Sequence, residues 1–425
     1  MGTEVDRIRQ LAEEHPERKH QTLIHCVNKE ALIAAHMKQS AKKAGGIDGE
    51  VKDSYGENLE ENIETLLSRM KQFSYRPQPV KRVYIPKEGD KGEVRPLGIP
   101  AYEDKLVQSC MADVLNAIYE PKFYDFSFGF RPGKDQHQAL SYLDDKLMGK
   151  TLWVLDADIK SFFDNVDHEW IMKFLGHNIA DKNFLRYITR FLKAGIMEEG
   201  KYMETDAGVP QGGSISPVLA NIYLHYVVDM WFAVEAKPKI AKGECHMVRF
   251  ADDIVLCFQR EEDMINIHKA LKERLAKFGL ELSDDKTKRI KFGRFAGEEA
   301  GTFDFLGFTF ITGKTRNGKF TVIKVTSQKK LKQKRRKVKE WIHKNMHQPI
   351  KAIIKRLNLG LRGHYNYYGL SHNLHRLRMF YGYVVRQLKY WLSRRSQRGY
   401  LSWEKFNKIL LYNPLLKPAI TRKLW

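Results

Sequence analysis

Cysteine pairs, long apolar runs and, in the last quarter, acidic residues are scarce in this chain of 425 residues. The four cysteines are scattered at Cys26, Cys110, Cys245 and Cys257. They form no Cys-x-x-Cys pair, which argues against a zinc finger or a disulfide framework and fits a reducing compartment. The N-terminus lacks an apolar signal core, and no uninterrupted apolar run approaches about 18 residues, so neither secretion nor a membrane span is expected.

Acidic residues are missing mainly from one part of the chain. Residues 321–425 contain 26 Lys and Arg but only two acids, whereas the rest of the chain is close to neutral; the net charge is +22. A near-neutral body with a strongly basic last quarter indicates a polyanionic partner. A merely soluble basic surface is the alternative, but ordinary surfaces mix both signs.

What the chain does contain is a change of pattern near residue 320. Hydrophobic content of 43% and aromatic content of 12% predict a folded chain with room for two or three domains. Upstream, helical periods alternate with short strands, and downstream an apolar helical stripe is surrounded by Arg and Lys. The fold class is therefore predicted to be α+β with an all-helical basic end. The expected elements are strands at 80–85, 152–159, 303–311 and 320–325, a hairpin at 247–258, and helices from 169, at 218–232 and at 262–278.

An Ala-Asp-Asp triplet joins the two halves of the expected hairpin. Apolar runs precede Phe250 and follow Asp253, which predicts two strands with Asp252 and Asp253 at their tip. Two adjacent carboxylates repel and are hard to keep ionised near apolar strands without a cation. Nucleotidyl transfer needs such a cluster, because two magnesium ions about 4 Å apart must bind the attacking and leaving oxygens. Alone, the triplet is usually an ordinary turn.

Two further segments strengthen this hypothesis. Asp156 and Asp158 lie at the end of an apolar run and, two residues apart, would share one face of a strand, so each is a candidate third ligand. Residues 208–217 are rich in glycine and proline, and their glycines let the backbone approach a ligand closely. As a lone feature this stretch would equally be just a turn.

In this order and spacing, the segments resemble the reverse transcriptases, and in the basic region the maturases of group II introns. The other matching segments are Lys87 with Val94–Pro100, Phe126–Pro132, Leu282–Thr287, Phe303–Phe308, Leu361–Gly369 and Trp391–Gln397. The resemblance covers about residues 23–420 and implies a right-hand polymerase with an antiparallel palm sheet. The implied domains are a lead-in at 1–22, fingers and palm at 23–320, a thumb or X domain at 321–398, and a short tail at 399–425 that could contact DNA.

The resemblance implies a specific catalytic set. Its metal ligands would be Asp158, Asp252, Asp253 and the backbone carbonyl of Ile159, holding two Mg²⁺ ions for which Mn²⁺ could substitute. Asp158 is favoured over Asp156 because it places Phe163 five residues on, where the ring would exclude a ribose 2′-hydroxyl and favour deoxynucleotides. Lys286 would protonate the leaving pyrophosphate, with a solvated surface charge as the alternative.

Nucleotide and primer contacts are implied in the same way. Lys87 and Arg95 would grip the triphosphate, unless they are solvated hairpin charges, and Gln211 would face the incoming nucleotide. Phe250, Gly307 and Phe308 would lie along the primer, although Phe308 is equally typical of a core strand. Position 250 is most often Tyr in this motif, so the ring is kept here and the hydroxyl is lost.

The basic quarter is predicted to bind RNA through phosphates and a few aromatic stacks. Aromatic residues on the apolar stripe are instead expected to pack the core. No cysteine follows Cys257, so the zinc-bound nuclease of many intron proteins is not expected. The candidate RNA-binding residues are Lys334, Arg335, Arg336, Lys337, Arg362, His364, Tyr365, Arg394 and Arg395.

Together these features predict an RNA-directed DNA polymerase encoded by a group II intron, which copies intron RNA into DNA at an insertion site and assists folding and splicing. The expected partners are intron RNA, an RNA template with a DNA primer, dNTPs and target DNA, in the bacterial cytoplasm or nucleoid and without a membrane. One alternative is a freestanding relative used in defence or repair. Another is a splicing-only RNA-binding protein, against which the intact aspartate triad counts.

Overall fold

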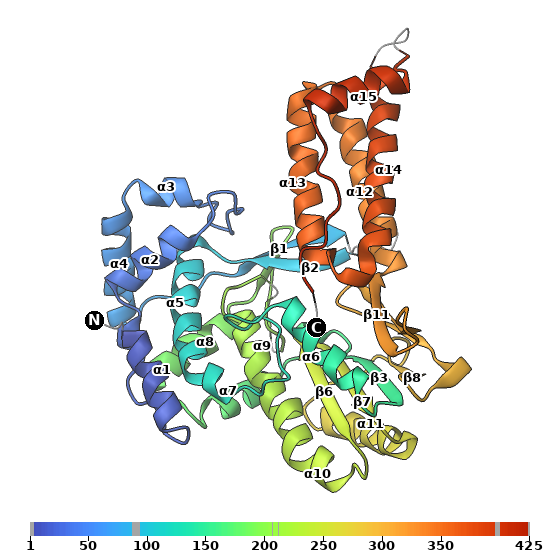
Figure 1. The fold of residues 1–425 in the computed structure, drawn as a ribbon. Coiled ribbons are helices and arrows are strands. Elements are labelled where there is room, and N and C mark those ends of the chain that lie inside the picture. The colour runs from blue at the N-terminus through green and yellow to red at the C-terminus, as the bar shows by residue number, and fades with distance from the viewer. Residues whose placement is uncertain (1–3, 87–93, 206, 211, 396–399, 424–425) are drawn as a thin grey trace. The chain divides into compact units, whose positions relative to one another are not determined.

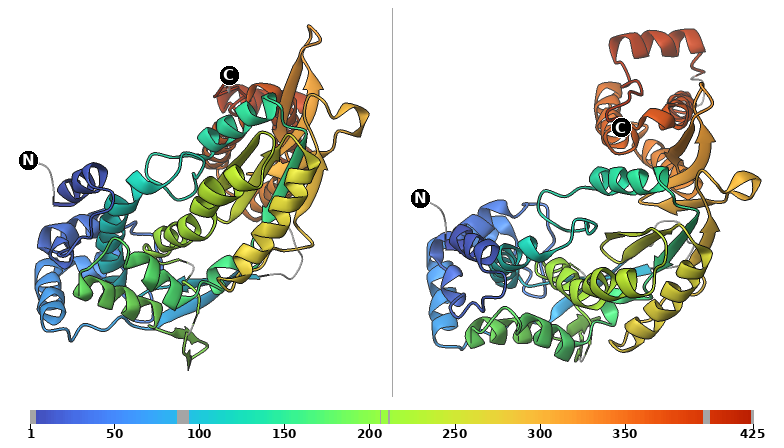
Figure 2. Two further views of the ribbon diagram at one scale, coloured as in Figure 1. Left: turned by 90° about the horizontal axis from the view of Figure 1, so that it is seen from below. Right: turned by 60° about the horizontal axis from the view of Figure 1, so that its bottom comes forward.

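The computed structural model describes residues 4–86, 94–205, 207–210, 212–395 and 400–423, and the chain divides into two compact units (Figures 1 and 2). Unit 1 comprises Met1–Lys87, Gly92–Tyr142 and Trp153–Arg289. Unit 2 comprises Glu88–Lys91, Leu143–Leu152 and Ile290–Trp425. Two elements cross the boundary, namely α6 (Gln136–Met148) and β8 (Lys288–Lys291).

Helices make up most of unit 1. Helix α5 is buried on nearly every side, with α1, α2 and α9 packed against it. Asp181 caps α8 and also accepts the amides of Leu23 and Ile24, so one carboxylate ties the N-terminal region to this helix. The helices and helical turns are α1 (Glu4–Glu14), η1 (Ile24–Cys26), α2 (Lys29–Lys38), α3 (Lys52–Gly56), α4 (Leu59–Lys71), α5 (Tyr102–Tyr119), η2 (Glu120–Lys122), η3 (Phe162–Asp164), α7 (His168–Leu175), α8 (Lys182–Leu192), α9 (Ser216–Leu224), η4 (His225–Asp229), η5 (Phe232–Ala236), α10 (Lys237–Lys239) and α11 (Glu261–Ala276).

Two four-stranded sheets accompany these helices, in the orders β2-β1-β4-β5 and β6-β7-β3-β8. In the first, β1 pairs antiparallel with β2 and parallel with β4. In the second, β7 pairs antiparallel with both β6 and β3. The predicted hairpin at 247–258 and strand at 152–159 are confirmed. The strands are β1 (Val80–Pro86), β2 (Val94–Ile99), β3 (Trp153–Asp158), β4 (Ile196–Glu198), β5 (Lys201–Met203), β6 (Cys245–Phe250) and β7 (Asp253–Phe258).

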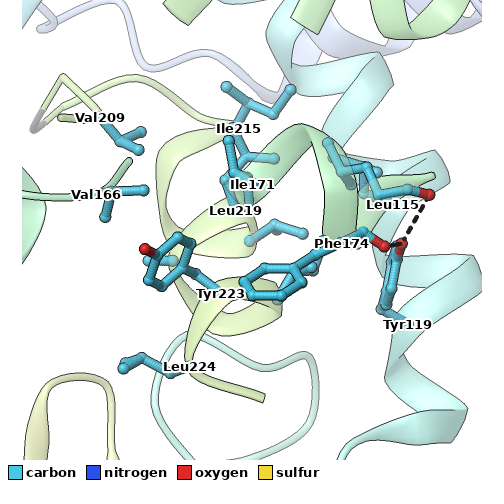
Figure 3. Close-up of a cluster of buried hydrophobic side chains, with 14 of the residues drawn as sticks. Leu115, Tyr119, Val166, Ile171, Phe174, Val209, Ile215, Leu219, Tyr223 and Leu224 are labelled. Carbon is cyan, nitrogen blue, oxygen red and sulfur yellow. Dashed lines mark hydrogen bonds between the residues drawn. The ribbon is translucent and has the colours of Figure 1, made fainter. Parts of the chain in front are cut away.

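A dense apolar cluster lies between α5, α7 and α9 (Figure 3). The rings of Phe174 and Tyr223 meet edge to face with centroids 5.4 Å apart, and the Tyr119 hydroxyl donates to the Phe174 carbonyl. Burial of a side chain of this size contributes roughly 1.5–3 kcal/mol. Val166 and Val209 belong to the same cluster. The core therefore anchors the two loops that carry Phe163 and the glycine-rich segment.

The stretch Ser216–Lys239 is long and apolar enough to cross a membrane, but 72% of its most apolar window is buried inside the protein. It contains two π-helical stretches, η4 and η5, in which the helix widens. Such widening changes which side chains face the core and is frequent at functional sites. The burial indicates a core helix.

The longest segment of unit 2, Ile290–Trp425, contains a small sheet followed by helices. The sheet order is β11-β10-β9, and α12 and α14 pack against one another. Helix α15 lies across the ends of α12–α14 that are remote from the sheet (Figures 1 and 2). The elements are η6 (Gly297–Glu299), β9 (Thr302–Phe305), β10 (Phe308–Lys314), β11 (Phe320–Thr326), α12 (Gln328–Asn345), α13 (Ile350–Tyr368), η7 (Ser371–Asn373), α14 (Leu374–Leu392) and α15 (Trp403–Tyr412).

The prediction of one continuous strand at 303–311 is wrong. A turn at Leu306 and Gly307, both with positive φ, folds this segment back on itself as the β9–β10 hairpin. Gly307 has φ +80°, and a Cβ there would lie 2.8 Å from the Tyr368 hydroxyl. The alternating apolar pattern predicted extended chain correctly, but the helix that crowds this glycine could not be read from it.

The last described residues run back along α13. Asn358 donates to the Pro414 carbonyl at 2.9 Å and accepts the Leu416 amide at 2.7 Å. Farther along, the Thr421 hydroxyl donates to the Tyr365 carbonyl at 2.9 Å. We call residues 413–423 the C-terminal strap. Its hydrogen bonds explain how a segment with little secondary structure is held in place.

Candidate active site

Three aspartates meet at one end of the β6-β7-β3 sheet. Asp158 is the last residue of β3 and lies directly opposite Asp253, the first residue of β7. Asp252 lies in the two-residue turn that joins β6 to β7, within what we call the aspartate turn, residues 250–253. Asp156 pairs with Val255, two positions farther into the sheet. The structure thus brings Asp158, Asp252 and Asp253 together and sets Asp156 back.

The carboxyl groups of the aspartate turn titrate above their ordinary range. Removal from bulk water raises the pKa of Asp252, and the negative charge of Asp158 adds to the shift. The same causes, together with the charge of Asp252, raise the pKa of Asp253 to about 6, although this residue lies at the open edge of the site. Repulsion of this kind is relieved by a bound cation. The donor set is therefore suited to a hard divalent ion.

Lys286 is the cation bonded to this group. Its Nζ donates to Asp158 Oδ2 at 2.9 Å, and this hydrogen bond raises the pKa of Lys286. The segment that carries Lys286 is held against the end of β3 by an antiparallel β-bridge between Ile159 and Leu282. Next to it, the Ser283 amide donates to the Asp158 carbonyl at 2.8 Å. This bond uses the Asp158 carbonyl and not that of Ile159, the expected backbone ligand.

The β1–β2 hairpin supplies a second positive charge. Arg95 is exposed, and its charge partly offsets the raised pKa values of Asp252 and Asp253. Lys87 and Gln211, the other expected nucleotide contacts, lie outside the described residues. The expectations for these two side chains therefore stay predictions.

Phe163 is held by the glycine-rich loop. It is half-buried in η3, whereas neighbouring Phe162 is buried in the core. The Val209 amide donates to the Phe163 carbonyl at 2.7 Å. Gly208 has φ +89°, and a Cβ there would lie 3.1 Å from the Phe163 carbonyl oxygen. Only glycine fits this approach without strain, so the loop fixes the segment that carries the aromatic ring.

A cavity of about 440 Å³ opens beside Phe163. Its walls come from β1, β2, the β4–β5 hairpin and the glycine-rich loop. A volume of this order suits a small-molecule ligand. The lining includes Arg82, Pro96, Gly98, Phe163, Met203, Gly208 and Pro210.

The expected primer contacts differ in their exposure. Phe250 is half-buried in the aspartate turn. Phe308 is fully buried, and its ring centroid lies 5.1 Å from that of Tyr368 and 6.1 Å from that of Tyr367. Phe308 thus fits the alternative of a core strand residue, and Gly307 offers only backbone. The expectation of direct side-chain contact with a primer therefore rests on Phe250.

The expected RNA-binding cations of α12 and α13 are largely exposed. Lys334, Arg336, Lys337 and Arg362 are exposed, and half-buried Arg335 lies over the Tyr383 ring at 5.4 Å. In α14 and its C-terminal end, Arg394 lies 3.7 Å from the Tyr390 ring centroid, and burial lowers the pKa of Arg395, which donates to the Gln348 carbonyl.

His364 and Tyr365 are not exposed, which corrects the expectation that both side chains face RNA. They retain 4% and 2% of their surface, and burial lowers the pKa of His364 to about 4. Both continue the buried stripe of α13 that contains Leu357 and Leu361, at the helical spacing of three and four residues. That spacing was the sequence signal for burial.

Another group of metal-ligand type lies elsewhere in unit 1. Ligand atoms of Glu4, His25 and Cys26 lie within 4.8 Å of one another. Glu4 and His25 form an ion pair at 3.5 Å, and burial raises the pKa of the Cys26 thiol to about 11. A thiol that resists ionisation is a poor metal ligand. The ion pair suffices to explain the cluster.

Comparison with known proteins agrees with this geometry. Residues 85–310 match the family model of the reverse transcriptase (RNA-dependent DNA polymerase), and residues 331–409 match the group II intron maturase-specific domain. The group II intron-encoded protein LtrA of Lactococcus lactis subsp. cremoris is 31% identical over 422 residues, covering 81% of this chain and 70% of LtrA. Protein YkfC of Escherichia coli K12 is 31% identical over 334 residues, covering 70% and 84%. The chain therefore belongs to the group II intron-encoded reverse transcriptases, RNA-directed DNA polymerases that carry a maturase domain.

Proposed function

We propose that the site formed by Asp158, Asp252 and Asp253 is the polymerase centre, which extends a DNA primer with dNTPs on an intron RNA template. The observation that carries the proposal is the direct pairing of Asp158 with Asp253, beside Asp252, with the pKa values of both turn carboxyls raised. Carboxylates that repel one another at the end of a sheet are a suitable ligand set for divalent cations.

The three carboxylates would hold two Mg²⁺ ions, or Mn²⁺ in their place. When bound, such ions lower the free energy of the charge that develops on the attacking and leaving oxygens. Lys286 is protonated at neutral pH, as an ordinary lysine is, and its hydrogen bond to Asp158 raises its pKa further. It therefore carries a proton that could pass to the leaving pyrophosphate.

Phe163 and Arg95 would select and hold the nucleotide. Arg95 presents a planar fork suited to a triphosphate. The Phe163 ring, fixed through its carbonyl by Val209, would occupy the space that a 2′-hydroxyl needs. We infer that unit 1 and the start of unit 2 form the fingers and palm of a right-hand polymerase, with α12–α14 as its thumb.

The basic helical region would serve splicing. Exposed cations along α12 match the phosphates of a folded intron RNA, and target DNA is the proposed partner during insertion. The matched maturase-specific domain, at 331–409, covers these helices. In this scheme the protein works wherever the intron RNA is transcribed, in the bacterial cytoplasm or nucleoid.

Primer extension on an RNA template tests the proposal. Asp252→Ala removes one metal ligand and is expected to lower the rate by several orders of magnitude, since such charge stabilisation is usually the largest catalytic contribution. Asp156→Asn, two residues from Asp158 on the same strand, is the matched control and should keep most activity. In the same assay, Phe163→Val should raise the ratio of ribo- to deoxynucleotide incorporation. Near wild-type extension by Asp252→Ala would show that the triad is assigned wrongly.

A further inference from the structure

Arg249, the residue directly before the aspartate turn, is a fully buried cation. Its side chain is 0% exposed. A guanidinium has five N–H donors, and the hydrogen bonds of Arg249 account for every one of them. The bonds run from Nε to Asp229 Oδ1 (2.7 Å), from Nη2 to Asp229 Oδ2 (2.5 Å) and Ser127 Oγ (2.7 Å), and from Nη1 to Asn221 Oδ1 (3.1 Å) and the Ala251 carbonyl (3.0 Å).

The backbone of Arg249 is held as firmly as its side chain. Its amide donates to the Phe126 carbonyl at 2.8 Å, and its carbonyl accepts the Phe128 amide at 2.9 Å. The segment 126–128 therefore pairs with the end of β6 from the side opposite β7. The last residues before the turn are fixed through backbone and guanidinium together.

The partner carboxylate occupies a special place in its helix. Asp229 is also 0% exposed and ends the π-helical stretch η4, where the wider turn changes which side chains point inward. A buried ion pair is costly to desolvate and is weak evidence for stability by itself. The carboxylate at the end of this widened stretch bonds Arg249 directly, which indicates a positional role for the pair.

The arginine acts on the turn through Ala251. This residue has φ +58°, a left-handed conformation that costs a residue with a Cβ about 1–3 kcal/mol unless its surroundings enforce it. Its carbonyl accepts Arg249 Nη1, and a Cβ on Gly129 would lie 2.2 Å from its amide nitrogen. Asn221 bonds both Arg249 and the Gly129 carbonyl, the latter at 2.7 Å. The turn is thus enclosed by groups that converge on one guanidinium.

We propose that Arg249, held by Asp229, is a positioning residue that fixes the Ala251 carbonyl and so sets the places of the Asp252 and Asp253 carboxylates for metal binding. The proposal rests on the function proposed above for these two aspartates. A lysine could not replace the arginine, because a single ammonium has three donors and no planar fork. Both side chains are 0% exposed, so the pair acts on the metal site only through the turn.

Arg249→Lys tests the proposal against a matched control. Arg131 is another buried arginine, paired with Glu120 at 2.7 Å; its side chain also donates to the Tyr124 and Ser127 carbonyls but makes no bond to the aspartate turn. Arg131→Lys therefore reproduces the loss of a buried guanidinium pair that holds the neighbouring segment 126–128 but removes no bond to Arg249 or to the turn. Ser127→Ala, which removes a single acceptor from Arg249, provides a milder variant for the case in which Arg249→Lys folds poorly.

The readouts separate positioning from stability. Melting temperature gives the structural effect of each variant, and Mn²⁺ binding to the nucleic-acid-free protein, followed by electron paramagnetic resonance, gives the state of the carboxylates. Arg249→Lys is expected to weaken Mn²⁺ binding and to lower kcat by about tenfold or more with little change in the dNTP KM, since small misplacements of catalytic groups cost up to about 100-fold. Ser127→Ala should change Mn²⁺ affinity and kcat in the same direction as Arg249→Lys does, but by a smaller factor.

Arg131→Lys, at a comparable loss of melting temperature, should leave Mn²⁺ affinity unchanged. Equal Mn²⁺ affinity and kcat in the Arg249→Lys and Arg131→Lys proteins would overturn the positioning role. Asp252→Ala serves as the reference that separates the two proposals. If it is inactive while Arg249→Lys matches the control, the polymerase centre stands and only the positioning role fails; if it is active, the proposed function fails first.

Discussion

Arg249 and Asp253 lie four positions apart, yet the protein treats their charges in opposite ways. Arg249 is enclosed and has an acceptor for every N–H group. Asp253 lies at the edge of the sheet beside two other carboxylates, and its pKa is raised to about 6. The charge of Arg249 is fully compensated by hydrogen-bond acceptors, whereas the carboxylate of Asp253 is destabilised by its neighbours and would be stabilised by a bound cation. This contrast is expected where a rigid support carries a ligand set for metal ions.

Asp253 should make stability depend on pH in the metal-free protein. Its folded-state pKa, about 6, exceeds the value of about 3.9 for an unfolded aspartate. The folded state therefore holds its proton more tightly, and stability is lost as pH rises from about 4 through about 6. Asp253→Asn removes this loss, so its melting temperature should exceed that of wild type at pH 7.5 and approach it at pH 4.5. Melting curves of the two proteins, recorded in chelator at pH 4.5 and pH 7.5, measure these differences.

Added Mg²⁺ should reverse that difference. A ligand that binds only the folded state raises its stability, and the carboxylate is needed for binding. Wild type should therefore gain melting temperature with Mg²⁺ at pH 7.5, and Asp253→Asn should gain less. A difference between the two proteins that is the same at pH 4.5 and pH 7.5 in chelator would contradict a raised pKa at this position.

At the scale of elements, sequence patterns located the site but not its support. The apolar runs around Asp252 and Asp253 predicted the hairpin, and the end of the run at Asp158 predicted the opposing strand. The pairing of these two strands follows from no local pattern, because β3 and β7 are far apart in the chain. Asp229, which is buried, ends a π-helical stretch for which the sequence shows no signal that we can name.

The C-terminal strap is a second case in which a local sequence pattern does not predict a long-range contact. Its residues have no helical or alternating period, so the sequence predicted only a short tail with a small helical unit. In the structure, its backbone hydrogen bonds go largely to α13, with Asn358 both donating and accepting. Leu415 is buried at 4% exposure. Long-range pairing of this kind depends on side chains of another element, so it cannot be predicted from the sequence of the strap itself.

Asn358→Ala should loosen the strap. It removes two hydrogen bonds to residues 414 and 416, each contributing about 0.5–1.5 kcal/mol. Hydrogen exchange of the strap amides should therefore speed up while exchange in the β6–β7 hairpin stays unchanged. Asn407→Ala, at an exposed position of α15, is the matched control. Strap protection equal in both variants would show that Asn358 does not hold this segment.

At the scale of the whole molecule, charge is distributed unevenly. Residues 321–425 carry 26 cations against two acids, whereas the aspartate triad lies in a part of the chain that is close to neutral. Local positive charge attracts a polyanion, and the site itself needs only small cations. In the proposed function, RNA binding and metal binding use different parts of the chain, so each should be removable without the other.

The last prediction tests this separation on α12. Replacing Lys334, Arg335, Arg336 and Lys337 by Ala removes four cations, of which Lys334, Arg336 and Lys337 are exposed. If they neutralise phosphates, the salt dependence of intron RNA binding should become shallower, by about 0.7–0.9 log units per log unit of salt for each phosphate that is no longer neutralised. Filter binding across a salt series measures the slope, and Mn²⁺ binding at the aspartate triad should be unchanged.

An equal reduction of net charge elsewhere provides the control. Lys71, Lys182, Lys193 and Lys239 are exposed lysines of unit 1, and their replacement by Ala also removes four cations. A polyanion attracted only by net charge would respond to both quadruple variants alike. A polyanion bound at α12 should respond to the first variant alone, because counterion release counts the phosphates that the protein actually neutralises. Equal slopes in the two variants would place the RNA-binding surface elsewhere on the protein.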